Sequence, residues 1–228
     1  MIPLRDNVPA RSFPAITIAI IAVNVGVWLF YQVPHVRRSA VELGFEPCTA
    51  VQWCADRGVS WPFDVVTAMF AHGSWLHIAG NMLFLWIFGN NVEDAMGKIR
   101  FAVFYLLAGL AAAALQGYVT LAFGSPAETR IPNLGASGAI AGVLGAYFVL
   151  YPAARVLIFA FFLLVEVPAV TFLGLWFLFQ LWQGGFSLIA PAAGGGVAFF
   201  AHVGGFLFGL LAVKVFAARR RYQIAEHW

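Results

Sequence analysis

Six long apolar stretches separated by short polar segments constrain this chain more than any other feature of its sequence. Inside a lipid bilayer, an open chain satisfies its backbone hydrogen bonds only as helix, and about 20 residues are needed to cross. Only 10% of the 228 residues are charged, whereas a soluble domain usually carries about a quarter. The sequence therefore predicts an all-α, polytopic membrane protein with six transmembrane helices. The six stretches are 15–31, 76–89, 101–123, 136–151, 156–182 and 197–217.

These stretches divide the chain into an N-terminal segment (1–14), a membrane domain (15–217) and a C-terminal tail (218–228). The first stretch could be the apolar region of a signal peptide behind Arg5 and Arg11. It is long for such a region and no small-residue cleavage site follows it, so a retained helix is the preferred interpretation. The basic residues flank apolar runs instead of forming a patch, so we expect the lipid bilayer, and not nucleic acid, as partner.

The distribution of positive charge predicts an orientation. With six crossings both termini lie on one side, where nine Lys and Arg residues fall against four on the other. Because cytoplasmic loops are enriched in Lys and Arg, we expect cytoplasmic termini and a plasma-membrane location. No organelle transit peptide is recognisable, which favours the inner membrane of a prokaryote. The nine are Arg5, Arg11, Lys98, Arg100, Arg155, Lys214, Arg219, Arg220 and Arg221; the four are Arg37, Arg38, Arg57 and Arg130.

Two segments outside the expected helices are informative. The loop 32–64 carries Cys48 and Cys54, which could form a disulfide on the outer side or stay unpaired. The glycine-rich turn 184–197 suits a movable cap over a buried site, although it could be a plain linker.

Ser137 stands where the fourth stretch begins, between Gly135 and Gly138. About 15 residues of helix are roughly 22 Å long, so this stretch cannot cross a core of ~30 Å unaided, and its start must lie below the surface. A serine there could simply cap the helix. The free N–H groups of a helix N-terminus are also suited to stabilising an oxyanion beside a nucleophile.

His202 lies near the start of the sixth stretch, where small residues repeat every four positions. A lone histidine in an apolar helix is more often structural. Small residues on both helices, however, allow the close backbone approach that a contact between a serine and a histidine requires. These residues are Ala201, Gly205 and Gly209 on the sixth stretch and Gly138, Gly142 and Ala146 on the fourth.

His77 and Asn81 share one face of the second helix, at positions i and i+4. Either could stabilise the bundle by a hydrogen bond, and together they could also donate to an oxyanion. Both lie within about two turns of the same end of the bundle as Ser137 and His202, ~5–10 Å below the surface. The sequence thus predicts one polar layer that holds all four residues.

Three short segments resemble the rhomboid family of intramembrane serine proteases. They are HGSWLHIAGN at 72–81, GASG at 135–138 and AHVGG at 201–205. The resemblance implies a six-helix rhomboid-like fold in which Ser137 is the nucleophile and His202 the general base. His77, Asn81 and the Ser137 amide would hold the oxyanion, and Glu93 would be structural. It implies no cofactor or metal, and as substrates the transmembrane segments of single-pass membrane proteins, cut near the outer face of the membrane.

Two departures from the family pattern stand out. Some members carry a Trp-Arg pair before the second helix, where this chain has Trp61 to Asp64 (WPFD). Some place a tyrosine against the histidine ring one turn after the nucleophile, where this chain has Ala141. His202 must therefore be oriented by another group, which the sequence does not identify.

Two other functions fit parts of the sequence. One is a rhomboid-like protein without catalysis that binds membrane clients, although such relatives generally lack the serine or the histidine. The other is a small transporter, for which Glu166, followed by Pro168 in the fifth stretch, is the main indication. Zinc and aspartyl chemistry are disfavoured because the chain has no HExxH motif and no intrahelical pair of aspartates.

Overall fold

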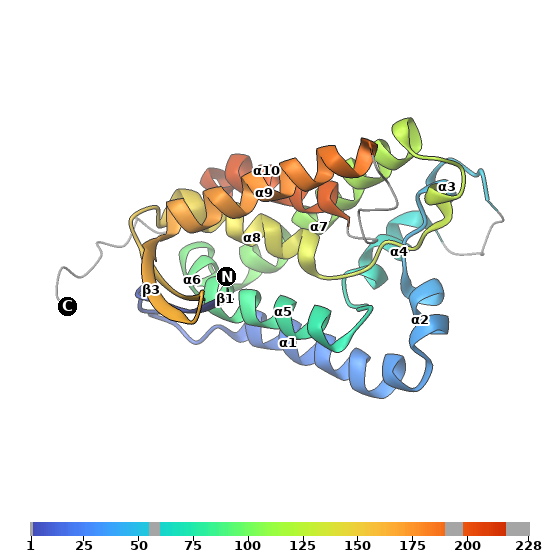
Figure 1. Ribbon diagram of the computed structural model, residues 1–228. Helices are drawn as coiled ribbons and strands as arrows, with labels where there is room; N and C mark the ends of the chain where they lie inside the picture. The colour runs from blue at the N-terminus through green and yellow to red at the C-terminus, as the bar shows by residue number, and fades with distance from the viewer. Residues whose placement is uncertain (1, 55–59, 190–197, 218–228) are drawn as a thin grey trace.

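The computed structural model describes residues 2–54, 60–189 and 198–217, and most of them are helical (Figure 1). Four helical stretches are long and apolar enough to cross a membrane, and a fifth apolar helix, Ser137–Leu150, is shorter. The four are Ala15–Leu43, Lys98–Phe123, Ala169–Ile189 and Phe199–Phe216. The described part is thus a mostly helical, polytopic membrane protein. The prediction is confirmed in that coarser form, whereas an all-α architecture is not, because a small sheet is present.

The helices follow the apolar stretches closely at five of the six positions. The first stretch is α1 (Ala15–Val27), extended by η1 (Trp28–Gln32) and η2 (Val33–His35) into α2 (Val36–Leu43). The second is α5 (Trp75–Phe84), which continues through η3 (Leu85–Gly89) into α6 (Asn90–Met96). The third, fourth and sixth are α7 (Lys98–Phe123), α8 (Ser137–Leu150) and α10 (Phe199–Phe216).

The short helix α8 forms the centre of the bundle, between α5 on one side and α9 (Ala169–Ile189) and α10 on the other (Figure 1). Every residue from Gly138 to Tyr147 is buried. Gly142 and Gly145 allow this, because a Cβ at Gly142 would lie 3.2 Å from the Gly205 carbonyl oxygen, and one at Gly145 would clash with the Phe206 carbonyl. Backbone therefore lies against backbone between α8 and α10, as the small residues predicted.

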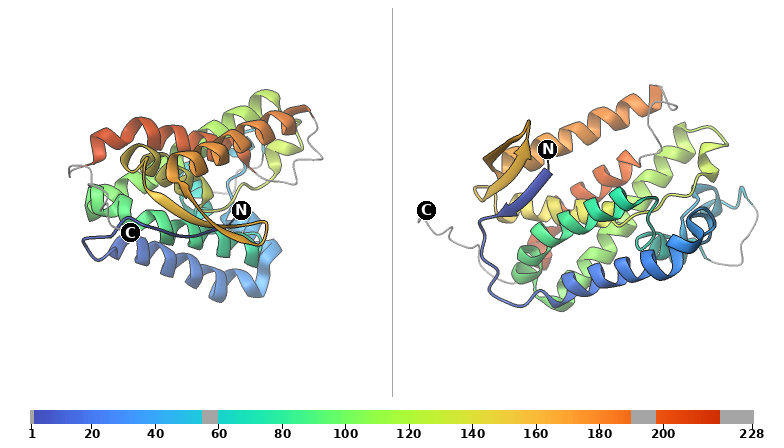
Figure 2. Two further views of the ribbon diagram at one scale, coloured as in Figure 1. Left: turned by 60° about the vertical axis from the view of Figure 1, so that its left-hand side comes forward. Right: turned by 60° about the horizontal axis from the view of Figure 1, so that its bottom comes forward.

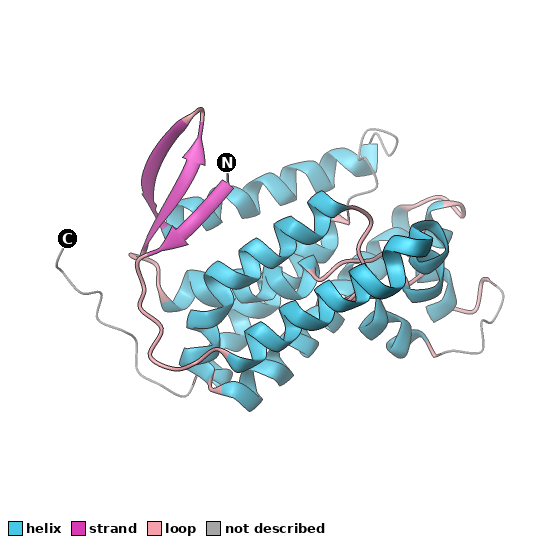
Figure 3. Ribbon diagram, turned by 90° about the horizontal axis from the view of Figure 1, so that it is seen from below, coloured by secondary structure: helices cyan, strands magenta, loops and turns pink. Residues whose placement is uncertain are grey.

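The prediction of a fifth helix over 156–182 is wrong for its first part. Residues 155–168 form a hairpin of β2 (Arg155–Ala160) and β3 (Leu163–Pro168), and the helix α9 begins only at Ala169. β1 (Ile2–Asp6) pairs antiparallel with β2, so the sheet order is β1-β2-β3, at the end of the bundle where α8 ends and α9 begins (Figures 2 and 3). An unbroken apolar run reads alike as helix or buried strand, which is why the hairpin was missed.

The hairpin also changes the environment of Glu166. This residue lies in β3 opposite Leu157, and its side chain is exposed, so it is not an acidic group inside a helix. The indication for a transporter is therefore absent from the structure.

Glu93 of α6 joins the start of α1 to the rest of the bundle. Its carboxylate, 1% exposed, accepts hydrogen bonds from the backbone N–H groups of Ile16 and Thr17, at 3.0 and 2.8 Å, and from the Thr17 hydroxyl, at 2.8 Å. The two N–H groups belong to the first turn of α1, where the helix itself supplies no acceptor and negative charge is favourable. The contacts agree with the structural role that the resemblance implied for Glu93.

Asp6, at the end of β1, contacts the far end of α8. Its Oδ2 accepts hydrogen bonds from the Asn91 amide and the Tyr147 hydroxyl, both at 2.6 Å. Burial raises the pKa of Asp6 to about 6, although these two hydrogen bonds act in the opposite direction. The native protein consequently binds more protons than the unfolded chain between about pH 4 and pH 6. The contribution of Asp6 to stability is therefore lost as the pH rises through that window.

We expect Asp6→Asn to abolish a pH dependence of about 3 kcal/mol in the free energy of unfolding. In the wild-type protein this contribution is full below pH 4 and gone above pH 6, whereas an amide does not titrate. Unfolding in detergent between pH 4 and pH 7 measures the difference. Curves of equal slope for the two proteins would contradict the prediction.

The segment expected as a loop, 32–64, contains short helices, and its two cysteines are paired. Besides η2 and α2 it holds α3 (Pro47–Ala50) and the start of α4 (Trp61–Ala68), while η4 (Glu128–Arg130) lies in the connection before α8. Cys48 and Cys54 form a disulfide, with Cα atoms 5.6 Å apart. Phe45 pairs with Asn133 through two backbone hydrogen bonds of 2.9 and 2.8 Å. These bonds hold the segment against the connection that leads to Ser137.

Two expected regions lie outside the described residues. They are the C-terminal tail, 218–228, and the part of the glycine-rich turn at 190–197. The described start of that turn belongs to α9, which extends to Ile189.

Candidate active site

Ser137 is the first residue of α8, and its side chain does not cap the helix. The N-cap position is Ala136, which makes no side-chain cap hydrogen bond. Gly135, with a φ of +123°, turns the chain sharply into the helix, in a conformation that residues with a Cβ rarely adopt. The Ser137 hydroxyl is therefore free to interact across the bundle.

The Ser137 hydroxyl contacts the ring of His202. The distance from Oγ to Nε2 is 2.8 Å, although the two residues lie on different helices. His202 is in the first turn of α10, so both residues stand near the start of their helices. A serine whose hydroxyl reaches an imidazole nitrogen can pass its proton to that ring and become a nucleophile.

The other ring nitrogen of His202 contacts Gln180 of α9. The Gln180 Oε1 lies 2.8 Å from Nδ1 of His202, and the Trp176 ring lies 5.8 Å from the His202 ring at an angle of 38°. Since Gln180 offers an oxygen acceptor, Nδ1 carries the proton and Nε2 keeps the lone pair that faces Ser137. The ring is thus in the tautomer that a general base requires.

His77 and Asn81 lie on α5, and His77 faces the same point as Ser137. A Cβ placed on Gly135 would lie 2.8 Å from Nε2 of His77 and 3.5 Å from Oγ of Ser137. The Gly73 N–H donates to Nδ1 of His77 over 3.4 Å, which leaves the ring proton on Nε2. His77 can therefore donate a hydrogen bond into the space beside the hydroxyl.

Asn81 is 8% exposed, and its amide nitrogen has no hydrogen-bond partner within the part of the chain that the structure describes. A buried donor without a partner costs roughly 1–3 kcal/mol, which suits a group reserved for a ligand. The Ser137 N–H at the helix N-terminus would be a further donor. Together these groups could stabilise negative charge that develops next to Ser137.

Polar contacts at its N-terminal end hold α5 in place. Ser74 caps the helix by accepting from the His77 N–H over 3.1 Å. The Gln32 side chain accepts from the His72 N–H over 2.8 Å and donates to the His72 carbonyl over 3.0 Å. The His72 ring then packs edge-on against that of His77, with centroids 5.1 Å apart. The position of His77 is therefore set from both its helix and the preceding turn.

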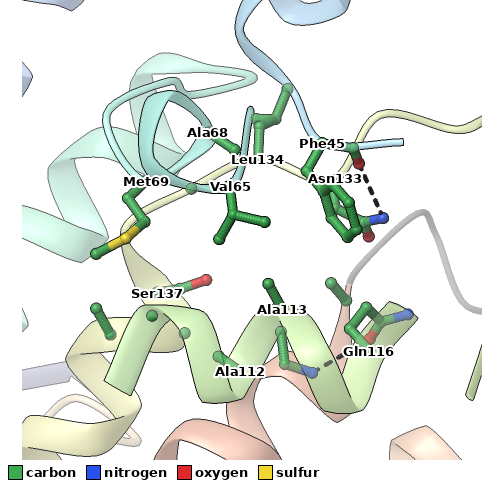
Figure 4. Close-up of a pocket in the computed structure, with 16 residues that line it drawn as sticks. Phe45, Val65, Ala68, Met69, Ala112, Ala113, Gln116, Asn133, Leu134 and Ser137 are labelled. Atoms are coloured by element: carbon green, nitrogen blue, oxygen red, sulfur yellow. Dashed lines mark hydrogen bonds between the residues drawn. The ribbon is translucent and has the colours of Figure 1, made fainter. Parts of the chain in front are cut away.

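A small cavity of about 50 Å³ adjoins the Ser137 hydroxyl (Figure 4). Its lining comes from α4, α7, α8 and α10, from Phe45 and from the chain before α8, and it is mostly apolar; Val65, Ala68 and Ala112 are examples. A space of this size can accept a small group or ordered water next to the hydroxyl.

Comparison with known proteins identifies the family. A family model described as "Rhomboid domain" matches residues 60–219, more than half of the chain. The chain belongs to the rhomboid family. The resemblance seen in the sequence motifs is thereby confirmed, together with the membrane-embedded, helical character that it implied.

Several rhomboid relatives are similar over most of this chain. "Rhomboid protein 1, mitochondrial" of Saccharomyces cerevisiae is 32% identical over 184 residues, 75% of this chain and 48% of the relative. "Presenilin-associated rhomboid-like protein, mitochondrial" of Homo sapiens is 31% identical over 198 residues, 84% of this chain and 45% of the relative. "Rhomboid-like protein 11, chloroplastic" of Arabidopsis thaliana is 29% identical over 127 residues, 54% and 38%. The chain thus spans about half the length, or less, of these relatives.

These relatives contradict the expected location. A prokaryotic plasma membrane with cytoplasmic termini was predicted, whereas the names of the relatives place them in mitochondria and a chloroplast. The physical reason is that loop charge and hydropathy report orientation in a bilayer and do not distinguish one membrane from another. The expectation of a plasma membrane is therefore wrong.

Sequence reasoning missed Gln180 and Gln32. Both are amides within apolar surroundings and 5% or less exposed. The available signal was a strongly polar residue inside an apolar run, which is costly in a membrane and points to a partner. That signal does not say which partner it is.

Proposed function

We propose that this chain is an intramembrane serine protease that cleaves transmembrane segments of single-pass membrane proteins. The observation that supports it most is the 2.8 Å contact between Ser137 and His202. The two residues come from helices that pack backbone to backbone in the bundle interior. Membership of a family that consists generally of such proteases adds to this support.

The proposal includes six membrane crossings. The four long helices account for four of them. The fifth and sixth are the continuous run from α5 to α6 and the short α8, whose start lies below the surface. α5, α8 and α10 then begin on the same side, where Ser137 and His202 meet.

In the first step, Nε2 of His202 takes the proton from Ser137 as Oγ forms a bond to the scissile carbonyl carbon. The carbonyl oxygen becomes an oxyanion, held by His77, Asn81 and the Ser137 N–H. His202 then returns the proton to the leaving amine nitrogen as the C–N bond breaks. The product is an ester between Ser137 and the new carboxyl end.

In the second step, a water molecule takes the place of the amine. Nε2 of His202 accepts its proton while the water oxygen attacks the ester carbonyl, and the same donors hold the oxyanion. The proton returns to Oγ when the ester bond breaks. The enzyme is restored and the second product leaves as a carboxylic acid.

Covalent labelling by a fluorophosphonate probe tests the nucleophile. Wild-type protein in detergent should be labelled because the probe reacts with a serine that a neighbouring base activates. Ser137→Ala should abolish labelling. Ser187→Ala is the matched control, since the Ser187 hydroxyl donates to the Gly184 carbonyl of its own helix, over 2.7 Å. Labelling that persists in Ser137→Ala would refute Ser137 as the nucleophile. No labelling of the wild type would favour a rhomboid-like protein that binds clients without catalysis.

A further inference from the structure

Gln180 is a polar residue on the buried face of the mostly apolar helix α9. Its side chain is 5% exposed, whereas those of the preceding residues, Leu178 and Phe179, are 60% and 50% exposed. An amide in such a position is unfavourable unless it is hydrogen-bonded. The bond that the structure gives it joins Oε1 to Nδ1 of His202, over 2.8 Å.

Packing between α9 and α10 does not require this amide. The Phe177 and Phe206 rings stack with centroids 4.5 Å apart and an angle of 18°, and Trp176 also packs against Phe206, at 6.2 Å. These contacts hold the two helices together through apolar surface alone. The amide therefore adds orientation of the His202 ring and little to the adhesion of the helices.

We propose that Gln180 is the positioning residue of His202, in the place that an aspartate takes in a Ser-His-Asp triad. This inference rests on the proposed protease function. An acceptor at Nδ1 selects the tautomer with a free lone pair on Nε2 and stops rotation of the ring. A neutral amide performs this role but does not add the negative charge with which a carboxylate stabilises the imidazolium.

The electrostatic surroundings of His202 make this difference measurable. From α5, the ionisable group that acts on the ring is His77. α8 presents the Ser137 hydroxyl, and α9 presents Gln180 and the Trp176 ring. From α7, the Gln116 amide oxygen accepts from the backbone N–H of Ala201 next to the histidine, over 3.2 Å. A carboxylate introduced at position 180 would consequently be a new charge of opposite sign beside the imidazolium.

Two substitutions test the role, with cleavage of a single-span substrate in liposomes as the assay. Gln180→Leu, which keeps the volume and removes the acceptor, should lower kcat about tenfold and leave KM unchanged within twofold, since one hydrogen bond is lost. Gln180→Glu should retain activity, because the acceptor remains. Its carboxylate favours the protonated ring, so the acidic limb of kcat/KM against pH should move to higher pH.

Gln183→Leu is the matched control, because Gln183 lies on the same helix one turn further and is only partly buried. It should show the wild-type kcat and the wild-type dependence of kcat/KM on pH. The inference is overturned if Gln180→Leu keeps the wild-type kcat, or if it loses rate together with thermal stability while Gln180→Glu leaves the pH profile unmoved. Failure of the protease function itself is distinguishable, since cleavage would then persist in Ser137→Ala or be absent from the wild type.

Discussion

Ser137→Ala and His202→Ala are each expected to lower kcat for cleavage of a single-span substrate roughly 10⁴- to 10⁶-fold. Without Oγ no covalent intermediate forms, and without the imidazole the hydroxyl 2.8 Å away is not deprotonated. KM should change little, because neither side chain supplies much of the surface that binds a helix. Cleavage in liposomes, followed on gels and by mass of the products, measures the effect.

The two residues should also act as a unit. The double variant is expected to be no slower than the slower single variant, since removal of either partner already disables the pair. His35→Ala is the matched control, because His35 is an exposed histidine far along the chain from either residue. Losses that multiply in the double variant would mean that the two side chains act independently, contrary to the dyad.

A weaker effect should separate the oxyanion donors from the dyad. Asn81→Ala should retain measurable cleavage with kcat lowered about 10²- to 10³-fold, as for the loss of one such donor. The buried amide nitrogen without a partner among the described residues is the basis for this expectation. A wild-type rate for Asn81→Ala, measured in the same liposomes, would remove Asn81 from the oxyanion site.

Much of the candidate site could be proposed from the sequence because polar residues are rare in the membrane domain. Each of Ser137, His202, His77 and Asn81 stands out against apolar neighbours, and helical rise places all four at a similar depth. The glycines of α8 and α10 then indicated which helices touch. The shared depth in the membrane and the small residues together leave few possible partners for the Ser137 side chain.

Other features could not be predicted, for reasons that lie in the residues themselves. Residues 156–165 are all apolar, and such a run has no periodicity that distinguishes helix from strand. The pairing of β2 with β1, far away in sequence, cannot be read from the run itself. Gln180 lies on a different helix from both Ser137 and His202, so no spacing rule connects it to the ring. The presence of Ala141 in place of a tyrosine indicated that another group must orient His202. It did not indicate where in the fold that group lies.

The close contact between α8 and α10 leads to the second large effect. Gly205→Val should destabilise the protein by about 3 kcal/mol and lower kcat more than 100-fold. A Cβ at Gly205 would collide with the Gly138 carbonyl and lie 3.2 Å from the Gly142 nitrogen. These are backbone atoms of α8, which cannot turn aside as a flexible side chain can. The helices must separate, and Oγ of Ser137 then leaves the reach of the His202 ring.

The matched control is Gly26→Val on α1, where a Cβ would meet nothing within 4 Å. It should unfold and cleave as the wild type does, because no backbone lies in its way. Thermal unfolding in detergent, cleavage in liposomes and fluorophosphonate labelling, compared across the three proteins, separate loss of fold from loss of alignment. Labelling should fall in Gly205→Val even below its unfolding temperature, since the hydroxyl loses its base while the bundle is still folded. Full labelling and cleavage by a folded Gly205→Val protein would mean that backbone contact between α8 and α10 is not what brings serine and histidine together.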